Sequence, residues 1–272
     1  MTGLLTLDAV RFGYDPERPV LEDISFAVQH GEVVAVVGRN GAGKSTMLRL
    51  LNGLLRPDAG RLTIAGRDSA DLKVSEIAAH IGTVFQAPEQ QIFNATVRSE
   101  IGFGPAQQGL APREQAARID EAVARTGLEG VLDTHPLDLD AAMRRFVAVA
   151  SVIACRPDLM LLDEAQRGLD ATRRATLGGI IADWKASGRA IVLVCHDMDF
   201  VAAHADRVLG LAAGRLAVDA PVRDFFADAA ATRAVSVEQP GIVALAQALG
   251  QPVALSASEL VTGLAPRLKG GA

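Results

Sequence analysis

The chain lacks four features that would place it in a specialised class of protein. Its two cysteines, Cys155 and Cys195, lie in apolar segments without CxxC or metal-ligand spacing, so we expect reduced core thiols and a reducing compartment. Lys and Arg form no cluster and the net charge is −5, which argues against nucleic-acid binding. The N-terminus lacks a signal-peptide pattern. The longest uncharged segment, residues 239–258, contains prolines, glycines and glutamines, so we expect a soluble chain without a membrane span.

What the sequence does contain is an alternation of strand and helix patterns over 272 residues, enough for one large domain or one domain with an appendage. This alternation predicts an α/β fold with a parallel core and a helical insertion, in which Pro105, Pro112 and Pro136 punctuate the helices. Strands are predicted near residues 4–12, 20–29, 61–65, 81–86, 159–163 and 190–196, and helices over 96–155, near 171–187 and beyond 216.

The most informative segment is EVVAVVGRNGAGKST, residues 32–46. An apolar run typical of a buried strand enters a glycine-rich loop that fits G-x-x-x-x-G-K-[ST], and a helical pattern follows. Glycines let backbone amides face a phosphate chain, and the helix start adds its positive dipole end. We predict that the loop binds a nucleoside triphosphate, the alternative being a glycine-rich turn in a structural strand–helix unit. The residues predicted to bind are Gly38, Arg39, Asn40, Gly41, Ala42, Gly43, Lys44, Ser45 and Thr46, with Lys44 on the β- and γ-phosphates and the Ser45 hydroxyl on Mg²⁺.

A second motif, LMLLDEAQRGLD, occupies residues 159–170. Its apolar run places Asp163 and Glu164 at the C-terminal end of a core strand, the edge of an open α/β sheet at which ligands bind. We predict that Asp163 holds Mg²⁺ through water and that Glu164 polarises the attacking water. The alternative is a strand that simply ends in solvated acids.

Three single residues complete the predicted site. His196 ends the apolar run VLVCH, and the same sheet edge would bring it close to the γ-phosphate, where it links Glu164 to a partner chain. A purely structural histidine is the alternative. The amide oxygen of Gln86 is a further candidate ligand of Mg²⁺. Tyr14, the chain's one tyrosine, lies in a predicted loop where it could stack on a nucleobase.

In their order along the chain, these motifs resemble the nucleotide-binding subunit of ATP-binding cassette (ABC) transporters over residues 3–215. The segment FQAPEQQIF after Gln86 and the tail resemble the energy-coupling factor (ECF) type, in which paired ATPases drive uptake of vitamins or of cobalt and nickel ions. The resemblance implies a P-loop NTPase core with an antiparallel β subdomain and a helical subdomain at about 88–155, together forming an ATP-binding domain over 1–215, followed by a short C-terminal extension over 216–272.

The resemblance also implies partners. It implies a head-to-tail dimer that holds two ATP molecules between its subunits, with the glutamine loop docked on the cytoplasmic helices of an integral membrane protein. The chain would then work at the cytoplasmic face of the cell membrane. A soluble ABC ATPase without a membrane partner is disfavoured, because such proteins usually carry tandem cassettes or large insertions.

One family element departs from its pattern. Members carry LSGGQxxRVAIA at a helix start that closes the partner's site, whereas residues 139–150 here read LDAAMRRFVAVA. The serine becomes Asp140, both glycines become alanine, the glutamine becomes Met143 and the arginine becomes Phe146. DEPTAGLD likewise becomes DEAQRGLD.

An ionised Asp140 cannot donate a hydrogen bond to a phosphate and would repel it by about 4 kcal/mol at 4 Å and an effective dielectric constant near 20. As a helix N-cap, in contrast, Asp140 is well suited. We therefore expect ATP binding on the chain's own P-loop, with hydrolysis dependent on a partner that has an intact signature. The alternative is a homodimer that binds ATP with little or no hydrolysis.

Overall fold

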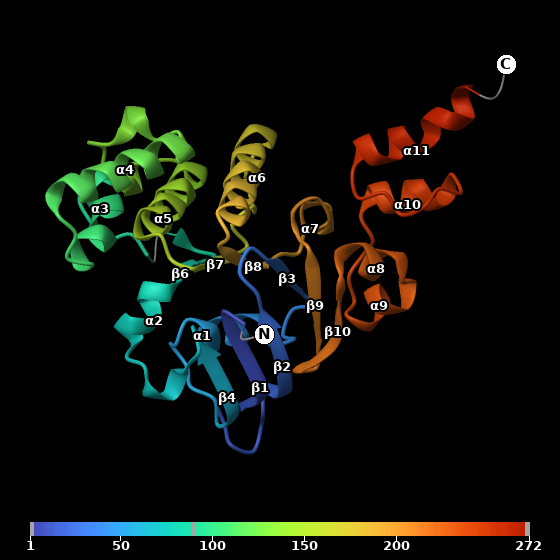
Figure 1. Ribbon diagram of the computed structural model, residues 1–272, viewed down its shortest axis with the longest axis horizontal. Coiled ribbons are helices and arrows are strands. Elements are labelled where there is room, and N and C mark those ends of the chain that lie inside the picture. The colour runs from blue at the N-terminus through green and yellow to red at the C-terminus, as the bar shows by residue number, and fades with distance from the viewer. Residues whose placement is uncertain (1–2, 89–90, 270–272) are drawn as a thin grey trace.

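Two β-sheets lie side by side with helices around them in the computed structural model, which describes residues 3–88 and 91–269 (Figure 1). The smaller sheet is antiparallel, in the order β2-β1-β4-β5, and the larger has the order β10-β9-β3-β8-β7-β6, parallel except for the β9–β10 pair. Their bounds are β1 Leu5–Phe12, β2 Leu21–Val28, β3 Val33–Val37, β4 Ala59–Ile64, β5 Arg67–Asp68, β6 Ile81–Val84, β7 Leu159–Asp163, β8 Ala190–Val194, β9 Arg207–Ala212 and β10 Arg215–Pro221.

Strand β3 lies inside the larger sheet, between β8 and β9. Its sequence VVAVV is buried at every position, as expected of a parallel strand covered on both faces. Alternate side chains enter different cores: Val33 and Val37 contribute to the core with the helical subdomain, and Val34 and Val36 to the core against the smaller sheet. The P-loop therefore starts from a strand that is held from both sides.

Most of the helices fall into three groups, and α2, α6 and α7 lie between them in the sequence. Helix α1 follows the P-loop, α3, α4 and α5 form the helical subdomain (green in Figure 1), and α8 to α11 lie at the C-terminal end. Their bounds are α1 Lys44–Leu51, α2 Val74–His80, α3 Val97–Gln107, α4 Pro112–Thr126, α5 Ala141–Cys155, α6 Ala171–Ala186, α7 Met198–His204, α8 Val222–Ala227, α9 Ala229–Ala234, α10 Gly241–Ala248 and α11 Ala257–Lys269.

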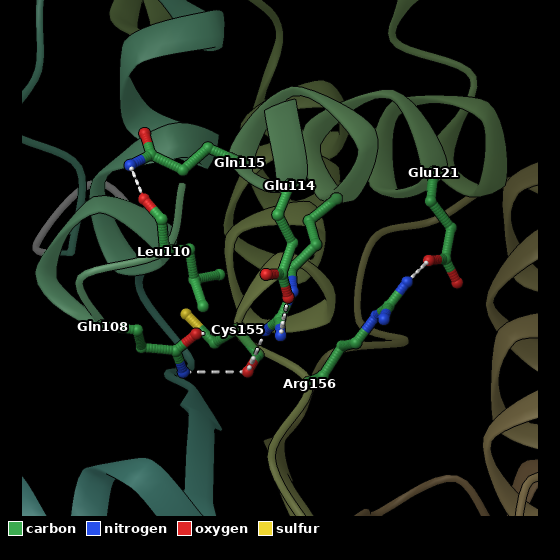
Figure 2. Close-up of polar contacts among 8 residues, drawn as sticks. Gln108, Leu110, Glu114, Gln115, Glu121, Cys155 and Arg156 are labelled. Atoms are coloured by element: carbon green, nitrogen blue, oxygen red, sulfur yellow. Dashed lines mark hydrogen bonds and ion pairs between the residues drawn. The ribbon is translucent and has the colours of Figure 1, made fainter. Parts of the chain in front are cut away.

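The helical subdomain is joined by a polar network at the end of α5. The Gln108 side-chain amide donates to the carbonyl oxygen of Cys155 at 2.9 Å, Gln115 donates to Leu110 at 2.7 Å, and Arg156 pairs with Glu121 (Figure 2). These contacts connect α3, α4 and α5 where the chain leaves α5.

The proline positions follow the expectation in part. Pro112 begins α4, and Pro136 begins the short 3₁₀ turn Pro136–Asp138, as expected of a residue with a fixed φ and no amide hydrogen. Pro105, in contrast, lies inside α3, which continues to Gln107. It occupies the last turn, where little helix follows, so it does not separate two helices.

The C-terminal boundary differs from the expectation at residue 215. Strand β10 starts at Arg215 and pairs antiparallel with β9 as far as Pro221, so the core sheet extends into the segment expected to be an extension. Phe225 and Phe226 of α8 are also fully buried in the main core. Among the described residues, Ala246 of α10 and Leu260 of α11 form a small separate cluster, while Val243 of α10 belongs to the main core. The sequence pattern missed β10 because an edge strand with alternating half-exposed residues resembles a loop that ends at a proline.

Both cysteines are free. Cys195 is buried and Cys155 is partly buried, so the prediction of core thiols is confirmed for Cys195 and only approximate for Cys155. Burial raises the pKa of the Cys195 thiol to about 12, which keeps it protonated and unreactive at neutral pH. Within residues 3–88 and 91–269, no helix has the length and apolar character needed to cross a membrane.

Candidate functional site

One pocket of about 880 Å³ gathers most of the predicted site residues. It lies at the carboxyl ends of strands β3, β6, β7 and β8, which is where ligands bind in open α/β sheets. The predicted residues that line it are Asn40, Gly41, Gly43, Lys44, Ser45, Thr46, Gln86, Asp163, Glu164 and His196. The pocket therefore unites the P-loop, the LLDE motif and the histidine loop.

The P-loop has the backbone shape that phosphate binding requires. Gly38 has φ +144°, and a Cβ atom there would lie 2.3 Å from the carbonyl oxygen of Leu211, so only glycine fits. Gly43 caps α1 with φ +105°, and no acidic residue lies in the first turn. The N-terminus of α1 therefore lines the pocket and has no carboxylate in its own first turn, as at anion sites on helix N-termini.

Lys44 lies inside this loop. It is 7% exposed, and its ammonium group donates to the carbonyl oxygens of Gly38 at 2.6 Å and Arg39 at 3.1 Å. Burial lowers the pKa of Lys44, and the nearby carboxylates of Glu164 and Asp163 oppose that shift. A buried cation held over the loop is what a triphosphate chain needs, so Lys44 fits its predicted role.

Gly38, Arg39 and Ala42 do not line the pocket, and they shape the loop instead. Gly38 and Arg39 accept from Lys44, and the backbone N–H of Ala42 donates to Arg39 at 3.2 Å. Direct contact between these residues and a nucleotide stays a prediction.

Asp163 ends β7 and Glu164 follows it, and both line the pocket. Burial raises the pKa of Asp163, with a further contribution from Glu164, and Lys44 opposes the shift. Glu164 is 7% exposed and has φ +52°, while its backbone N–H donates to the carbonyl oxygen of Val194 at 3.0 Å. A glutamate held at positive φ costs about 1–3 kcal/mol, and such strain clusters at functional sites.

The structure brings Glu164 and His196 into contact. The Nε2 atom of His196 lies 3.2 Å from Oε1 of Glu164, although the two residues follow different strands. The histidine is more exposed than the glutamate and faces the same pocket. His196 can therefore orient the Glu164 carboxylate, while its contact with a phosphate stays a prediction.

The predicted Mg²⁺ ligands also face one pocket. Ser45, Gln86 and Asp163 all line it, and hydroxyl, amide and carboxylate oxygen atoms are the kinds of ligand that Mg²⁺ takes alongside phosphates. Among the residues that the structure describes, no group of three or more His, Cys, Asp or Glu side chains forms a metal cage. The donor set fits an ion shared with a phosphate chain.

Tyr14 lies beside the pocket and not in its lining. Its hydroxyl is 3.4 Å from Oγ1 of Thr46 and accepts from Arg49 at 3.2 Å, and its ring stands edge-on to Phe12. The Thr46 contact, with help from Arg49, lowers the pKa of Tyr14. The ring is 59% exposed, and stacking on a nucleobase stays a prediction. In the segment after Gln86, residues 89–90 lie outside the described part of the chain.

Several pocket residues were not predicted. Arg174 pairs with Asp197 at 2.6 Å across the pocket wall. Gln166 and Arg167 lie at the positions where DEAQRGLD departs from the family pattern, and that departure could have marked them as site residues. No motif of the sequence includes Arg174 on α6, so nothing pointed to it. The unpredicted lining residues are Val20, Gln166, Arg167, Gly168, Leu169, Arg174, Val194 and Asp197.

The segment that departs from the signature pattern forms the start of α5. Asp140 caps it, accepting from the backbone N–H of Met143 at 2.7 Å, which confirms the N-cap prediction. Arg173 lies 3.2 Å from Asp140 and 3.5 Å from Asp170, joining the starts of α5 and α6. The repulsion estimated above assumed an unpaired carboxylate, and that assumption is wrong because Arg173 offsets part of the charge. Two defects of the signature remain: it has no hydroxyl donor for a phosphate, and two alanine methyl groups stand where the family has glycine.

Replacing Asp140 with alanine should remove this cap and lower the free energy of unfolding by about 1 kcal/mol at neutral pH. The Met143 amide, followed by Arg173, lowers the pKa of Asp140. The ionised cap therefore stabilises the fold above the ordinary carboxyl pKa, and the contribution is lost as the pH falls through the lowered pKa. Denaturant unfolding from neutral to acid pH measures the difference between the two proteins, which should shrink in acid.

Asp140→Ser keeps a capping oxygen and serves as the control, with a much smaller loss of stability. If Asp140→Ala lost the same stability at every pH, the ionised carboxylate would not be the stabilising group.

The fold and the pocket together define a P-loop ATP-binding domain with an inserted helical subdomain. The profile of the family described as ABC transporter matches residues 21–167, more than half of the chain. The chain belongs to this family, and it is an ABC-type ATP-binding subunit. The resemblance drawn from the motifs and the predicted α/β P-loop fold are both confirmed.

Relatives match over nearly the whole chain. It is 36% identical over 252 residues to the energy-coupling factor transporter ATP-binding protein EcfA2 of Symbiobacterium thermophilum, covering 90% of this chain and 88% of that protein. It is 33% identical to a putative ABC transporter ATP-binding protein of Pyrococcus furiosus, covering 96% and 99%. The solved structure of cbiO1 from Clostridium perfringens, part of the ABC transporter complex cbiONQ, superposes with a TM-score of 0.77 at 29% identity, covering 91% and 100%.

Proposed function

We propose that the chain hydrolyses ATP on its own P-loop, at the interface of a dimer, and thereby energises a membrane importer. The observation that carries the proposal is the single pocket in which Lys44, Asp163, Glu164 and His196 meet. These groups come from the P-loop helix, the end of β7 and the loop after β8. Phosphoryl transfer needs a cation, a metal ligand, a base and an orienting group, which are the roles we assign to them.

Each residue then has a defined task. Lys44 binds the β- and γ-phosphates, and Ser45, Gln86 and Asp163 hold Mg²⁺, which neutralises phosphate charge when bound. Glu164 accepts the proton of the attacking water, and the 3.2 Å contact with His196 keeps its carboxylate in place. Tyr14 covers the nucleobase from outside the pocket.

The second half of the catalytic site comes from a partner. A serine at the start of the partner's signature helix donates to the γ-phosphate, a charge-assisted bond of about 1.5–3 kcal/mol. Asp140 of this chain cannot donate, because its carboxylate is ionised and already bonds Met143 and Arg173. A heterodimer with one competent and one impaired site follows. The same observation supports the second candidate, a homodimer that binds ATP with little hydrolysis.

The transporter assignment rests on the relatives. Their names describe energy-coupling factor transporter ATP-binding proteins and a part of an ABC transporter complex. We propose by analogy that this chain docks on integral membrane subunits at the cytoplasmic face of the cell membrane, and that the importer carries a metal ion or a vitamin. No nucleic-acid partner is proposed.

Reconstitution tests the proposal. The purified chain alone should hydrolyse ATP very slowly, and adding a second ATP-binding subunit with an intact LSGGQ signature should restore turnover. Affinity purification from detergent-solubilised membranes should recover that subunit together with an integral membrane protein. Rapid hydrolysis by the isolated chain, or no gain on adding the partner, would contradict the proposal.

A further inference from the structure

Arg145 joins two loops that line the nucleotide pocket. It lies on α5, and its guanidinium group donates to the backbone carbonyl oxygen of Arg167 and, at 3.3 Å, to that of Gln86. Gln86 follows β6 and Arg167 follows β7, so one side chain spans two neighbouring strand ends. The side chains of Gln86 and Arg167 both line the pocket.

The turn that Arg145 contacts is continuous with the catalytic carboxylate. The backbone N–H of Arg167 donates to the carbonyl oxygen of Glu164 at 3.0 Å. A movement of the Glu164 turn therefore changes the position of the Arg167 carbonyl, which is the atom that Arg145 binds. The same holds on the other side for a movement of the loop that carries Gln86, a proposed Mg²⁺ ligand.

The helix that carries Arg145 is the one whose first turn faces the other subunit in the proposed dimer. Helix α5 starts from its N-cap Asp140 and packs against α3 and α4. A guanidinium group holds two acceptors in a fixed planar geometry, which a flexible point charge does not. Arg145 therefore bonds the helical subdomain directly to two loops of the chain's own pocket.

We propose that Arg145 is a positioning residue that transmits nucleotide binding at this chain's own pocket to the first turns of α5, the half-site offered to the partner. The inference rests on the proposed function, because it assumes ATP in the pocket. Arg145 precedes Phe146 by one position, and Phe146 is the buried residue that replaces the family arginine. The changed signature helix therefore still has an arginine beside that position.

Arg144 provides a matched control. It precedes Arg145 on the same helix, and its guanidinium group donates to the carbonyl oxygen of Leu137 at 3.0 Å, before the helix begins. Leu137 is not among the residues that line the pocket. Loss of Arg144 therefore removes a guanidinium–carbonyl bond of the same kind without breaking the link to the pocket.

Hydrogen exchange of the full-length chain tests the proposal. With Glu164→Gln present to prevent turnover, adding Mg²⁺ and ATP should slow amide exchange in the P-loop and also in residues 141–147. Arg145→Ala should keep the P-loop protection and lose that of residues 141–147 by about tenfold, the weight of a charged hydrogen bond. Arg144→Ala should keep both.

Arg145→Lys is the second variant, since it preserves charge and stem and should fold as stably as Arg144→Ala. It should also lose the α5 protection, because one ammonium group does not hold both carbonyls in the same geometry. If either Arg145 variant kept full α5 protection, or if ATP left α5 unprotected without substitution, the inference would be overturned and the proposed function would stand. Absence of P-loop protection would overturn the proposed function and the inference with it.

Discussion

Glu164→Gln is expected to lower ATP turnover by about a thousandfold in any complex whose partner supplies an intact signature. Glutamine keeps the size of the side chain and a hydrogen-bonding oxygen for His196, but it cannot accept a proton from water. The glutamate is 7% exposed and lines the pocket, so solvent water does not readily replace it as the proton acceptor. Single-turnover and steady-state hydrolysis by the reconstituted complex measure the effect.

The binding of ATP should survive this substitution. Lys44 and the P-loop amides are unchanged, so the ATP affinity measured by equilibrium titration should stay within about threefold, a difference well under 1.4 kcal/mol. Glu114→Gln, which removes a carboxylate paired with Arg118 at 2.8 Å on α4, is the matched control and should leave turnover unchanged. If the reconstituted complex hydrolysed ATP at the same rate with Glu164 and with the Glu164→Gln variant, this residue would not be the base.

Restoring the signature should have the second large effect. In a homodimer of the chain, Asp140→Ser, Ala141→Gly, Ala142→Gly and Met143→Gln together should raise ATP turnover by about ten- to a hundredfold, the value of one donor to a charged phosphate oxygen. Serine also caps the helix, so α5 should still begin at the same place. Steady-state hydrolysis at saturating ATP measures the gain.

The two glycines of the restored signature lower the stability of α5. Each glycine in the first turn weakens the helix by up to about 1 kcal/mol, and a variant with Ala141→Gly and Ala142→Gly alone is the control. That control should be less stable and no more active. No gain in the full variant would show that the defect lies elsewhere, with Arg167 in the turn after Glu164 as the next candidate.

Local sequence patterns predicted the central strands and the sheet edge at which these strands end. The buried run before Gly38 and the run before Asp163 became central strands because both faces of a parallel sheet are covered. The motif spacing also predicted that Glu164 and His196 share one sheet edge, and the structure places them 3.2 Å apart. These predictions succeeded because the carboxyl ends of parallel strands all lie at the same edge of the sheet.

Contacts between helices, and contacts of side chains with backbone carbonyls, were not predictable from the sequence. Arg173 and Asp140 lie on different helices, and nothing in either segment indicates that they pair. The same holds for Arg145, whose acceptors are backbone carbonyls of Gln86 and Arg167 and thus carry no side-chain signature. Strand β10 was missed for a related reason, since only pairing with β9 makes its half-exposed sequence a strand.

We propose that this chain has a competent nucleotide pocket and a defective signature. Complementation within one chain tests it without an outside partner. A variant with the restored signature and Glu164→Gln has a good half-site to offer and no base of its own, whereas the unsubstituted chain has the base and a poor half-site. Only a mixed dimer contains a complete catalytic site.

The decisive measurement is therefore ATP turnover of the two proteins, each alone and mixed in equal amounts, with dimer formation followed by sedimentation. We expect each protein alone to be nearly inactive and the mixture to hydrolyse ATP at least about tenfold faster. Mixed dimers that turn over no faster than either protein alone, or an unsubstituted chain as active as the mixture, would contradict it.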